Sequence, residues 1–243
     1  MSKKMKKISF DSLSDSGGRE INEDYLGSIE LGDRYYFVLC DGLGGHGNGN
    51  IASHFVVDQV LGCVQQGMSV EDSILYAQNA LLDKQKADQA EDSMKTTLTC
   101  LELAESDARF LHVGDSRIYL FEHHRYRLRS QDHSVPQMLV NRGSIKEKDI
   151  RHHEDRSRLL RVMGTPWDYP KYQVVDGIHI RSGTSFLLCS DGFWELINEK
   201  MMSRTLRKAK TPGDWLRSME RIVLKNGQGI NMDNYSAIAV FVR

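Results

Sequence analysis

The stretch Tyr35-Tyr36-Phe37-Val38-Leu39-Cys40-Asp41-Gly42 carries the clearest fold signal in the chain. Its uninterrupted apolar and aromatic run predicts a β-strand buried on both faces, and Asp41-Gly42 predicts a turn at the end of that strand. Two later runs end in the same way, Phe110-Leu111-His112-Val113-Gly114-Asp115 and Phe186-Leu187-Leu188-Cys189-Ser190-Asp191. A carboxylate at the edge of a core strand needs an explanation, because an unpaired buried charge is costly.

The residues around these runs predict an α+β fold with antiparallel sheets. Helical spacing is found over 50–66, over 70–90 behind the cap residue Ser69, and over 215–226 behind Thr211-Pro212. Further strands are expected at 7–10, 25–31, 98–103, 109–113, 117–121, 126–128, 171–180, 184–189 and 235–242. Strands mostly follow strands and the first helix pair is inserted as a block, which favours antiparallel sheets. No repeat or linker divides the sequence, so residues 1–243 are expected to form a single domain.

The composition is that of an ordinary globular protein. The 243 residues include 32 Lys and Arg against 33 Asp and Glu, a net charge of −1, and 40% of them are hydrophobic. This balance leaves no overall positive field for nucleic acid or an anionic membrane, so binding of either kind would need a local patch. No apolar run is long enough to span a membrane, and the lysines of residues 1–7 are not followed by the apolar segment of a signal peptide. The four cysteines form no Cys-x-x-Cys pair, so we expect a reduced, cytoplasmic protein. We also expect a monomer.

Two more aspartates stand beside expected strands, Asp24 before an early strand and Asp233 before the last one. A turn explains any one of these residues, since Asp-Gly and Asp-Asn pairs are common turn formers. Five of them at strand ends can instead converge at one rim, where only a cation or a group of Arg and Lys would hold them. Oxygen ligands without cysteine or repeated histidine suit Mg²⁺ or Mn²⁺ and do not suit zinc. Gly42 would let a backbone carbonyl approach such an ion, and two ions can activate a bridging water for in-line attack on phosphorus.

Six motifs in fixed order give the chain a family resemblance. They are Arg19-x-x-Asn22-Glu23-Asp24, Asp41-Gly42-Leu43-Gly44-Gly45-His46, Gly114-Asp115-Ser116-Arg117, Asp132-His133-Ser134, Ser190-Asp191-Gly192 and Asp233-Asn234-x-Ser236. From about Ser9 to its end, the chain resembles the metal-dependent serine/threonine protein phosphatases of the PPM (2C-type) family, in their short bacterial form. The resemblance implies a central β-sandwich of two antiparallel sheets with helices on both outer faces (αββα) and a metal centre at one end.

The resemblance also implies a set of metal ligands. Asp41 would bridge two Mn²⁺ or Mg²⁺ ions, and the Gly42 carbonyl would bind the first of them. Asp191 and Asp233 would bind the second ion. Asp24 would bind directly or through water. A weaker third site would be formed by Asp115 together with Asp191.

Two further residues are implied to act on the substrate. Arg19 would hold its phosphate as a bidentate guanidinium. His46 has two interpretations that remain open: it protonates the leaving serine or threonine oxygen, or it is a loop histidine at a glycine turn.

The chain departs from the family pattern at Lys95-Thr96-Thr97, where members usually carry Gly-Thr-Thr. No expected ligand is lost there. Residues 133–164 fall where the family carries a variable flap beside the active site, so His152 and His153 are interpreted as substrate or third-metal contacts. His133 is expected to be structural.

The leading interpretation is a protein phosphatase that hydrolyses phosphoserine and phosphothreonine in one step, by attack of a water that bridges two metal ions. No cysteine begins a Cys-x5-Arg loop, which argues against a thiol mechanism. Two alternatives stay open: a pseudophosphatase that binds phosphoproteins without turnover, and a metal-dependent phosphohydrolase of small phosphoesters. The expected partners are phosphorylated proteins and a cognate bacterial Ser/Thr kinase, with no nucleic acid and no membrane among them.

Overall fold

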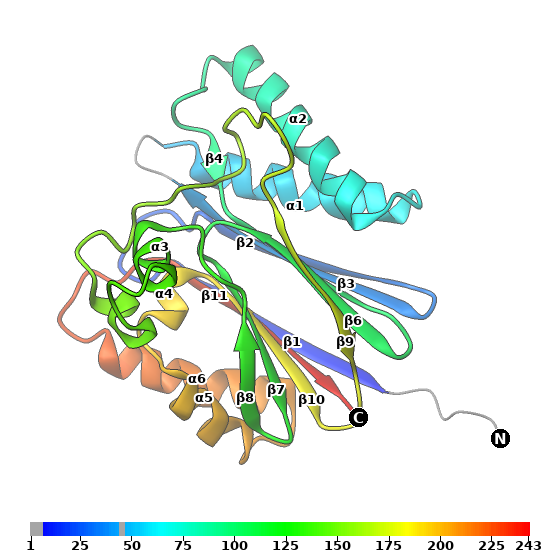
Figure 1. The fold of residues 1–243 in the computed structure, drawn as a ribbon, viewed down its shortest axis with the longest axis vertical. Helices are drawn as coiled ribbons and strands as arrows, with labels where there is room; N and C mark the ends of the chain where they lie inside the picture. The colour runs from blue at the N-terminus through cyan, green and yellow to red at the C-terminus, as the bar shows by residue number, and fades with distance from the viewer. Residues whose placement is uncertain (1–6, 44–46) are drawn as a thin grey trace.

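The protein folds into four layers, two β-sheets face to face between two layers of helices (Figure 1). The computed structural model describes residues 7–43 and 47–243. All strand pairs of the two sheets are antiparallel in this part of the chain. The expected αββα sandwich is therefore confirmed.

The first sheet has the strand order β2-β3-β5-β6-β9, with β4 paired to β3. Its members are β2 (Asp24–Leu31), β3 (Arg34–Leu43), β4 (Lys95–Thr96), β5 (Leu98–Leu103), β6 (Asp107–Val113) and β9 (Gln173–His179). The apolar run that starts at Tyr35 forms β3, which lies between β2 and β5. A central strand covered on both faces needs apolar side chains at every position, which explains the run.

The second sheet has the strand order β1-β11-β10-β7-β8. Its members are β1 (Ile8–Asp15), β7 (Arg117–Glu122), β8 (Arg125–Arg129), β10 (Thr184–Cys189) and β11 (Tyr235–Val242). The strand expected at residues 7–10 is longer than predicted, because β1 continues through polar residues to Asp15. As an edge strand, β1 pairs with β11 along its whole length and keeps a solvated face, so it does not need apolar residues there.

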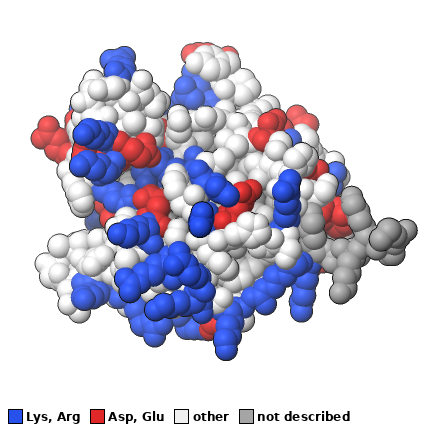
Figure 2. All heavy atoms as spheres, turned by 60° about the horizontal axis from the view of Figure 1, so that its bottom comes forward, with Lys and Arg blue, Asp and Glu red and all other residues white. Residues whose placement is uncertain are grey.

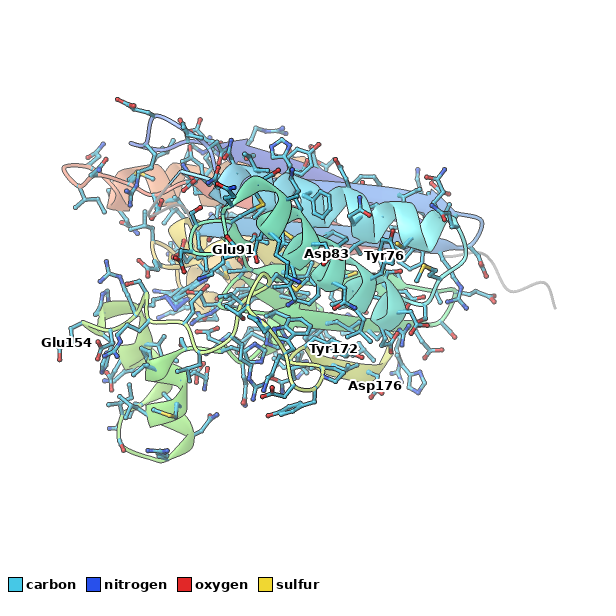
Figure 3. The ribbon with its side chains drawn as sticks, turned by 90° about the horizontal axis from the view of Figure 1, so that it is seen from above. Tyr76, Asp83, Glu91, Glu154, Tyr172 and Asp176 are labelled. Atoms are coloured by element: carbon cyan, nitrogen blue, oxygen red, sulfur yellow. The ribbon has the colours of Figure 1, made fainter. Side chains whose placement is uncertain are left out.

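Helices cover the outer faces of both sheets. On the first sheet lie α1 (Gly49–Gln65) and α2 (Val70–Asp88), which Figure 3 shows from above. On the second lie α5 (Glu199–Leu206) and α6 (Pro212–Asn226), and the shorter elements are α3 (Val135–Asn141), the 3-10 helix η1 (Glu147–His152) and α4 (Asp191–Trp194). The predicted caps are confirmed, since the hydroxyls of Ser69 and Thr211 each accept a backbone N–H bond of 3.1 Å. Helix α5 is not predicted by the sequence pattern, because most of its residues are polar or charged.

Three apolar clusters separate the four layers. The alternation along β3 sends Val38 and Cys40 toward α1 and α2, and Phe37 and Leu39 toward the second sheet. The third cluster lies between the second sheet and its helices and is centred on Trp215. All four cysteines are buried and unpaired. No helix in the described residues is long and apolar enough to cross a membrane.

Candidate active site

A cavity of about 490 Å³ opens where the ends of β3, β6 and β10 meet the start of β11. Residues of five of the six motifs line it: Arg19, Glu23, Asp41, Gly42, Asp115, Asp191 and Asp233. Asp24 is buried and lies opposite Asp41 without lining the cavity. The structure therefore brings the predicted metal and phosphate residues to one place.

The backbone of Asp41 is held firmly in the cavity wall. Its carbonyl oxygen accepts from Thr96 Oγ1 and from the backbone N–H of Thr97, each at 2.8 Å. Its own N–H donates to Thr97 Oγ1 at 2.9 Å. Lys95, the residue that replaces the usual family glycine, pairs with Leu43 in β3. The substitution therefore leaves the contacts of Thr96 and Thr97 intact.

Two glycines let backbone segments touch at the cavity wall. A Cβ on Gly42 would lie 2.3 Å from the carbonyl oxygen of Gly49, the first residue of α1. A Cβ on Gly192 would lie 2.2 Å from the carbonyl oxygen of Asn234. Only glycine permits approaches this close. The second contact packs the start of α4, at Asp191 and Gly192, against the segment that carries Asp233.

Asp24 is the most deeply buried of the predicted carboxylate ligands. Ser190 Oγ donates to its Oδ2 at 2.7 Å, while its Oδ1 is buried without a hydrogen-bond partner. Burial raises the pKa of Asp24 to about 7, and the bond from Ser190 opposes that rise. An unpartnered buried carboxylate oxygen is the kind of atom that a cation would satisfy.

The other carboxylates repel one another. Burial raises the pKa values of Asp41 and Asp115 well above the usual range, and the charge of Asp191 adds to the rise in both. The pKa of Asp191 is raised to about 7, first by burial and then by repulsion from Glu195 and Asp233. The cavity wall therefore carries more negative charge than its basic side chains neutralise.

Arg19 is the only Lys or Arg among the described residues that line the cavity. Its Nη2 donates to Asp233 Oδ2 at 3.0 Å, and both side chains are about half exposed, at 49% and 48%. The side chain of Asn234 anchors the loop that carries Arg19: it accepts from the N–H of Glu23 at 2.8 Å and donates to two carbonyls of the same loop. The sequence pattern assigned no role to Asn234, although it stands inside a motif.

The donor set fits a hard divalent cation. The described wall offers carboxylate oxygens and the Gly42 backbone, with neither cysteine nor histidine among its residues. In residues 7–43 and 47–243, no three His, Cys, Asp or Glu side chains already stand in an arrangement that would hold one ion.

A buried ion pair supports the cavity from behind, and its pairing is not visible in the sequence. Arg117 donates through Nε and Nη2 to the two carboxylate oxygens of Asp132, at 2.8 and 2.6 Å. The Arg117 guanidinium lies 3.3 Å from the ring centroid of Trp194. Trp194 Nε1 in turn donates to the carbonyl oxygen of Asp115 at 3.0 Å. The motif residues Arg117 and Asp132 thus act on the site through Trp194.

The predicted histidines differ in their placement. His46 lies outside the described residues. His133 is buried and its Nδ1 accepts from the N–H of Gly114 at 3.2 Å, which agrees with a structural role. Within the described wall, the segment 133–164 contributes Ser157 and Leu159 instead of the expected His152 and His153.

Comparisons with known proteins agree with the geometry. A family model described as protein phosphatase 2C matches residues 16–223. The serine/threonine phosphatase stp of Listeria monocytogenes is 28% identical over 204 residues, which cover 79% of this chain and 80% of the relative. The crystal structure of the serine/threonine phosphatase Stp1 from Staphylococcus aureus superposes with a TM-score of 0.83 at 25% identity, over 98% of this chain and 96% of that one. The catalytic domain of the phosphatase PstP, solved in complex with 2 manganese ions, shares the fold with a TM-score of 0.80 at 23% identity, over 97% and 98% of the two chains.

Proposed function

The chain belongs to the protein phosphatase 2C (PPM) family of serine/threonine phosphatases, and we propose that it cleaves phosphoserine and phosphothreonine in proteins by direct displacement with two Mn²⁺ or Mg²⁺ ions bound. Its substrates would include the targets of a cognate Ser/Thr kinase. One observation carries the proposal. Aspartates at four separate strand ends, Asp41, Asp115, Asp191 and Asp233, converge on one cavity whose described lining includes a single arginine.

The proposed ligands are the residues that the geometry gathers. Asp41, Asp24, Asp191 and Asp233, together with the carbonyl of Gly42, would hold the two core ions, and Asp115 with Asp191 would hold a third. When bound, such cations neutralise the carboxylates and the phosphate and lower the pKa of an attacking water.

The chain's own groups supply binding and orientation. Thr97 and Ser190 fix the backbone of Asp41 and the carboxylate of Asp24 through bonds of 2.8 and 2.7 Å, so these oxygens need no reorganisation. Arg19 stands at the exposed side of the cavity, where its planar guanidinium can take two phosphate oxygens in place of Asp233.

Hydrolysis of a phosphothreonine peptide is expected to require Mn²⁺ or Mg²⁺ and to stop when a chelator removes the ion. Phosphate release is measured with the metal, with chelator, and after excess metal is restored. Turnover that survives chelation would refute the two-ion proposal. Calorimetric Mn²⁺ binding without turnover would favour the pseudophosphatase, and faster turnover of nucleotides than of phosphopeptides would favour the small-phosphoester enzyme.

Replacing Arg19 with lysine should raise KM for a phosphopeptide by about ten-fold with a smaller effect on kcat, because lysine keeps the charge but loses the bidentate fork. Arg19→Ala should raise KM further. Steady-state kinetics on one peptide give both constants. Arg181→Lys, at an exposed arginine outside the described cavity wall, is the matched control. An Arg19→Ala enzyme with the KM of the wild type would contradict the assignment.

A further inference from the structure

The outer helical layer on the second sheet carries a concentrated positive charge. Residues 199–226 contain eight Lys and Arg against three Asp and Glu, in a chain of net charge −1. The rest of the chain has 24 Lys and Arg against 30 Asp and Glu, a net charge of −6. The near-neutral net charge of the whole chain therefore conceals a positive segment within an otherwise negative protein.

On α5 the cations share one side of the helix. Lys200 and Arg204 lie four residues apart on α5, and Arg207 and Lys208 follow its last residue at three and four residues from Arg204; all four are exposed. Residues at such spacings are neighbours along one helical face. The buried side of the same helix is apolar and includes Met202.

On α6 the same pattern recurs at Arg217, Arg221 and Lys225, which are spaced by four residues and exposed. The opposite side of α6 buries Trp215 and Met219 in the core. We name these seven exposed cations, on α5, on the turn that follows it and on α6, the basic face. Figure 2, which brings this end of the molecule forward, shows many Lys and Arg side chains there with few Asp and Glu among them.

The two rows of cations are held in a fixed relation. Trp215 Nε1 on α6 donates to the carbonyl oxygen of Met202 at 3.0 Å and to Thr205 Oγ1 at 3.1 Å, both on α5. In the part of the chain that the structure describes, only one cation of the basic face is in an ion pair, Arg217 with Asp214 at 2.8 Å. The remaining six are therefore available to an outside anion.

We propose that the basic face docks an acidic segment of the phosphoprotein substrate, outside the catalytic cavity. This inference rests on the proposed function. A phosphorylated segment carries negative charge at its phosphate, and the carboxylate-lined cavity attracts such a segment only where cations neutralise it. The basic face supplies the missing attraction close by in the chain, because α4 begins at Asp191 just before α5, and α6 ends shortly before Asp233.

A protein segment fits this surface better than a membrane does. In the described residues of α5 and α6, Leu224 is the only large apolar side chain that is strongly exposed, at 44%. Binding to a lipid surface normally combines basic residues with apolar side chains that enter the bilayer. A basic surface without exposed apolar side chains matches an acidic segment of a soluble protein.

The first test measures binding without turnover. Fluorescence anisotropy follows the binding of a fluorescein-labelled glutamate peptide, without phosphate, to the wild type and to two triple variants. The first is Arg204→Gln/Arg207→Gln/Lys208→Gln, and the second, the control, is Lys86→Gln/Lys148→Gln/Arg181→Gln. The control loses the same charge from three other exposed positions. We expect the first triple variant to bind about ten-fold more weakly and the control to bind as the wild type does, since each exposed ion pair contributes little and three add up. Binding should vanish at about 0.5 M salt.

The second test measures docking during catalysis. A phosphothreonine peptide joined by a flexible linker to the glutamate run should have a lower KM than the same peptide without it, with kcat unchanged. The difference should disappear in the Arg204 triple variant and persist in the control. Equal anisotropy curves for the two triple variants would overturn the proposal, as would tighter binding of single-stranded DNA or of vesicles containing phosphatidylserine. Because the anisotropy test needs no hydrolysis, its result stands apart from any failure of the proposed phosphatase activity.

Discussion

Replacing Asp191 with asparagine is expected to reduce phosphopeptide hydrolysis by about a thousand-fold or more. Asparagine keeps the shape of the side chain and removes the negative charge. Asp191 lines the cavity, begins α4, and shares its electrostatic environment with Asp41, Asp115 and Asp233. Loss of this carboxylate removes a proposed ligand of the second ion and of the third.

The same substitution should leave the protein folded and make the metal-free form more stable. The pKa of Asp191 is raised to about 7 by burial and by neighbouring carboxylates. At pH 8 the folded state therefore ionises this group at a cost in free energy that the unfolded chain does not have. This cost begins to fall as the pH drops below about 7, where the folded protein takes up the proton, and it vanishes only below the usual value of 3.8, where the unfolded chain is protonated as well. Thermal unfolding in chelator should accordingly show a higher Tm for the variant at pH 8 and a smaller difference at pH 6.

Asp83→Asn is the matched control, because it removes the same charge from an exposed position on α2 (Figure 3). It should change neither activity nor Tm by a measurable amount. An Asp191→Asn enzyme that hydrolyses the peptide at the rate of the Asp83→Asn enzyme would exclude Asp191 from the catalytic site. A variant that loses activity together with Tm would instead give Asp191 a structural role.

The core strands and their acidic ends are predictable from the sequence because both signals are local. The run from Tyr35 to Cys40 specifies a buried strand by its composition, and Asp41 follows it in the chain. The position of Asp24 opposite Asp41 depends on register, which the short Gly32-Asp33 turn between β2 and β3 sets. The motifs therefore predict that the acidic residues lie close together, and the Gly32-Asp33 turn places Asp24 opposite Asp41.

Other features depend on partners that no local pattern names. Helix α5 has too few apolar residues to be recognised alone, and it is held by the bonds from Trp215. The loop that carries Arg19 is ordered by Asn234, which is more than two hundred residues away in the chain. Contacts of this kind depend on tertiary packing, so local sequence patterns do not predict them.

Breaking the Arg117–Asp132 pair is expected to produce the largest loss of stability. Both side chains are 1% exposed, and Arg129 also donates to Asp132, at 3.0 Å. Arg117→Met leaves the buried carboxylate with one partner fewer and should lower the free energy of unfolding by about 3–5 kcal/mol. For a chain of this length, that corresponds to a fall in Tm of about 10 °C.

Arg127→Met on the neighbouring strand β8 is the control for this substitution. Arg127 pairs with Glu122 at 2.8 Å, but its side chain is 49% exposed, so its loss should cost at most about 1 kcal/mol. Equal Tm values for the two variants would show that the buried pair contributes no more than a surface pair.

Measuring kcat separates the contribution of Arg117 to stability from its contribution to the active site. Its guanidinium packs on Trp194, which holds the carbonyl of Asp115 at the cavity wall. We therefore expect Arg117→Met to lower kcat for phosphopeptide hydrolysis even at temperatures where the variant is fully folded, whereas Arg127→Met leaves kcat unchanged. A folded Arg117→Met enzyme with the kcat of the wild type would restrict the ion pair to a role in stability. It would show that the contact of Arg117 with Trp194 is not needed to position Asp115 for catalysis.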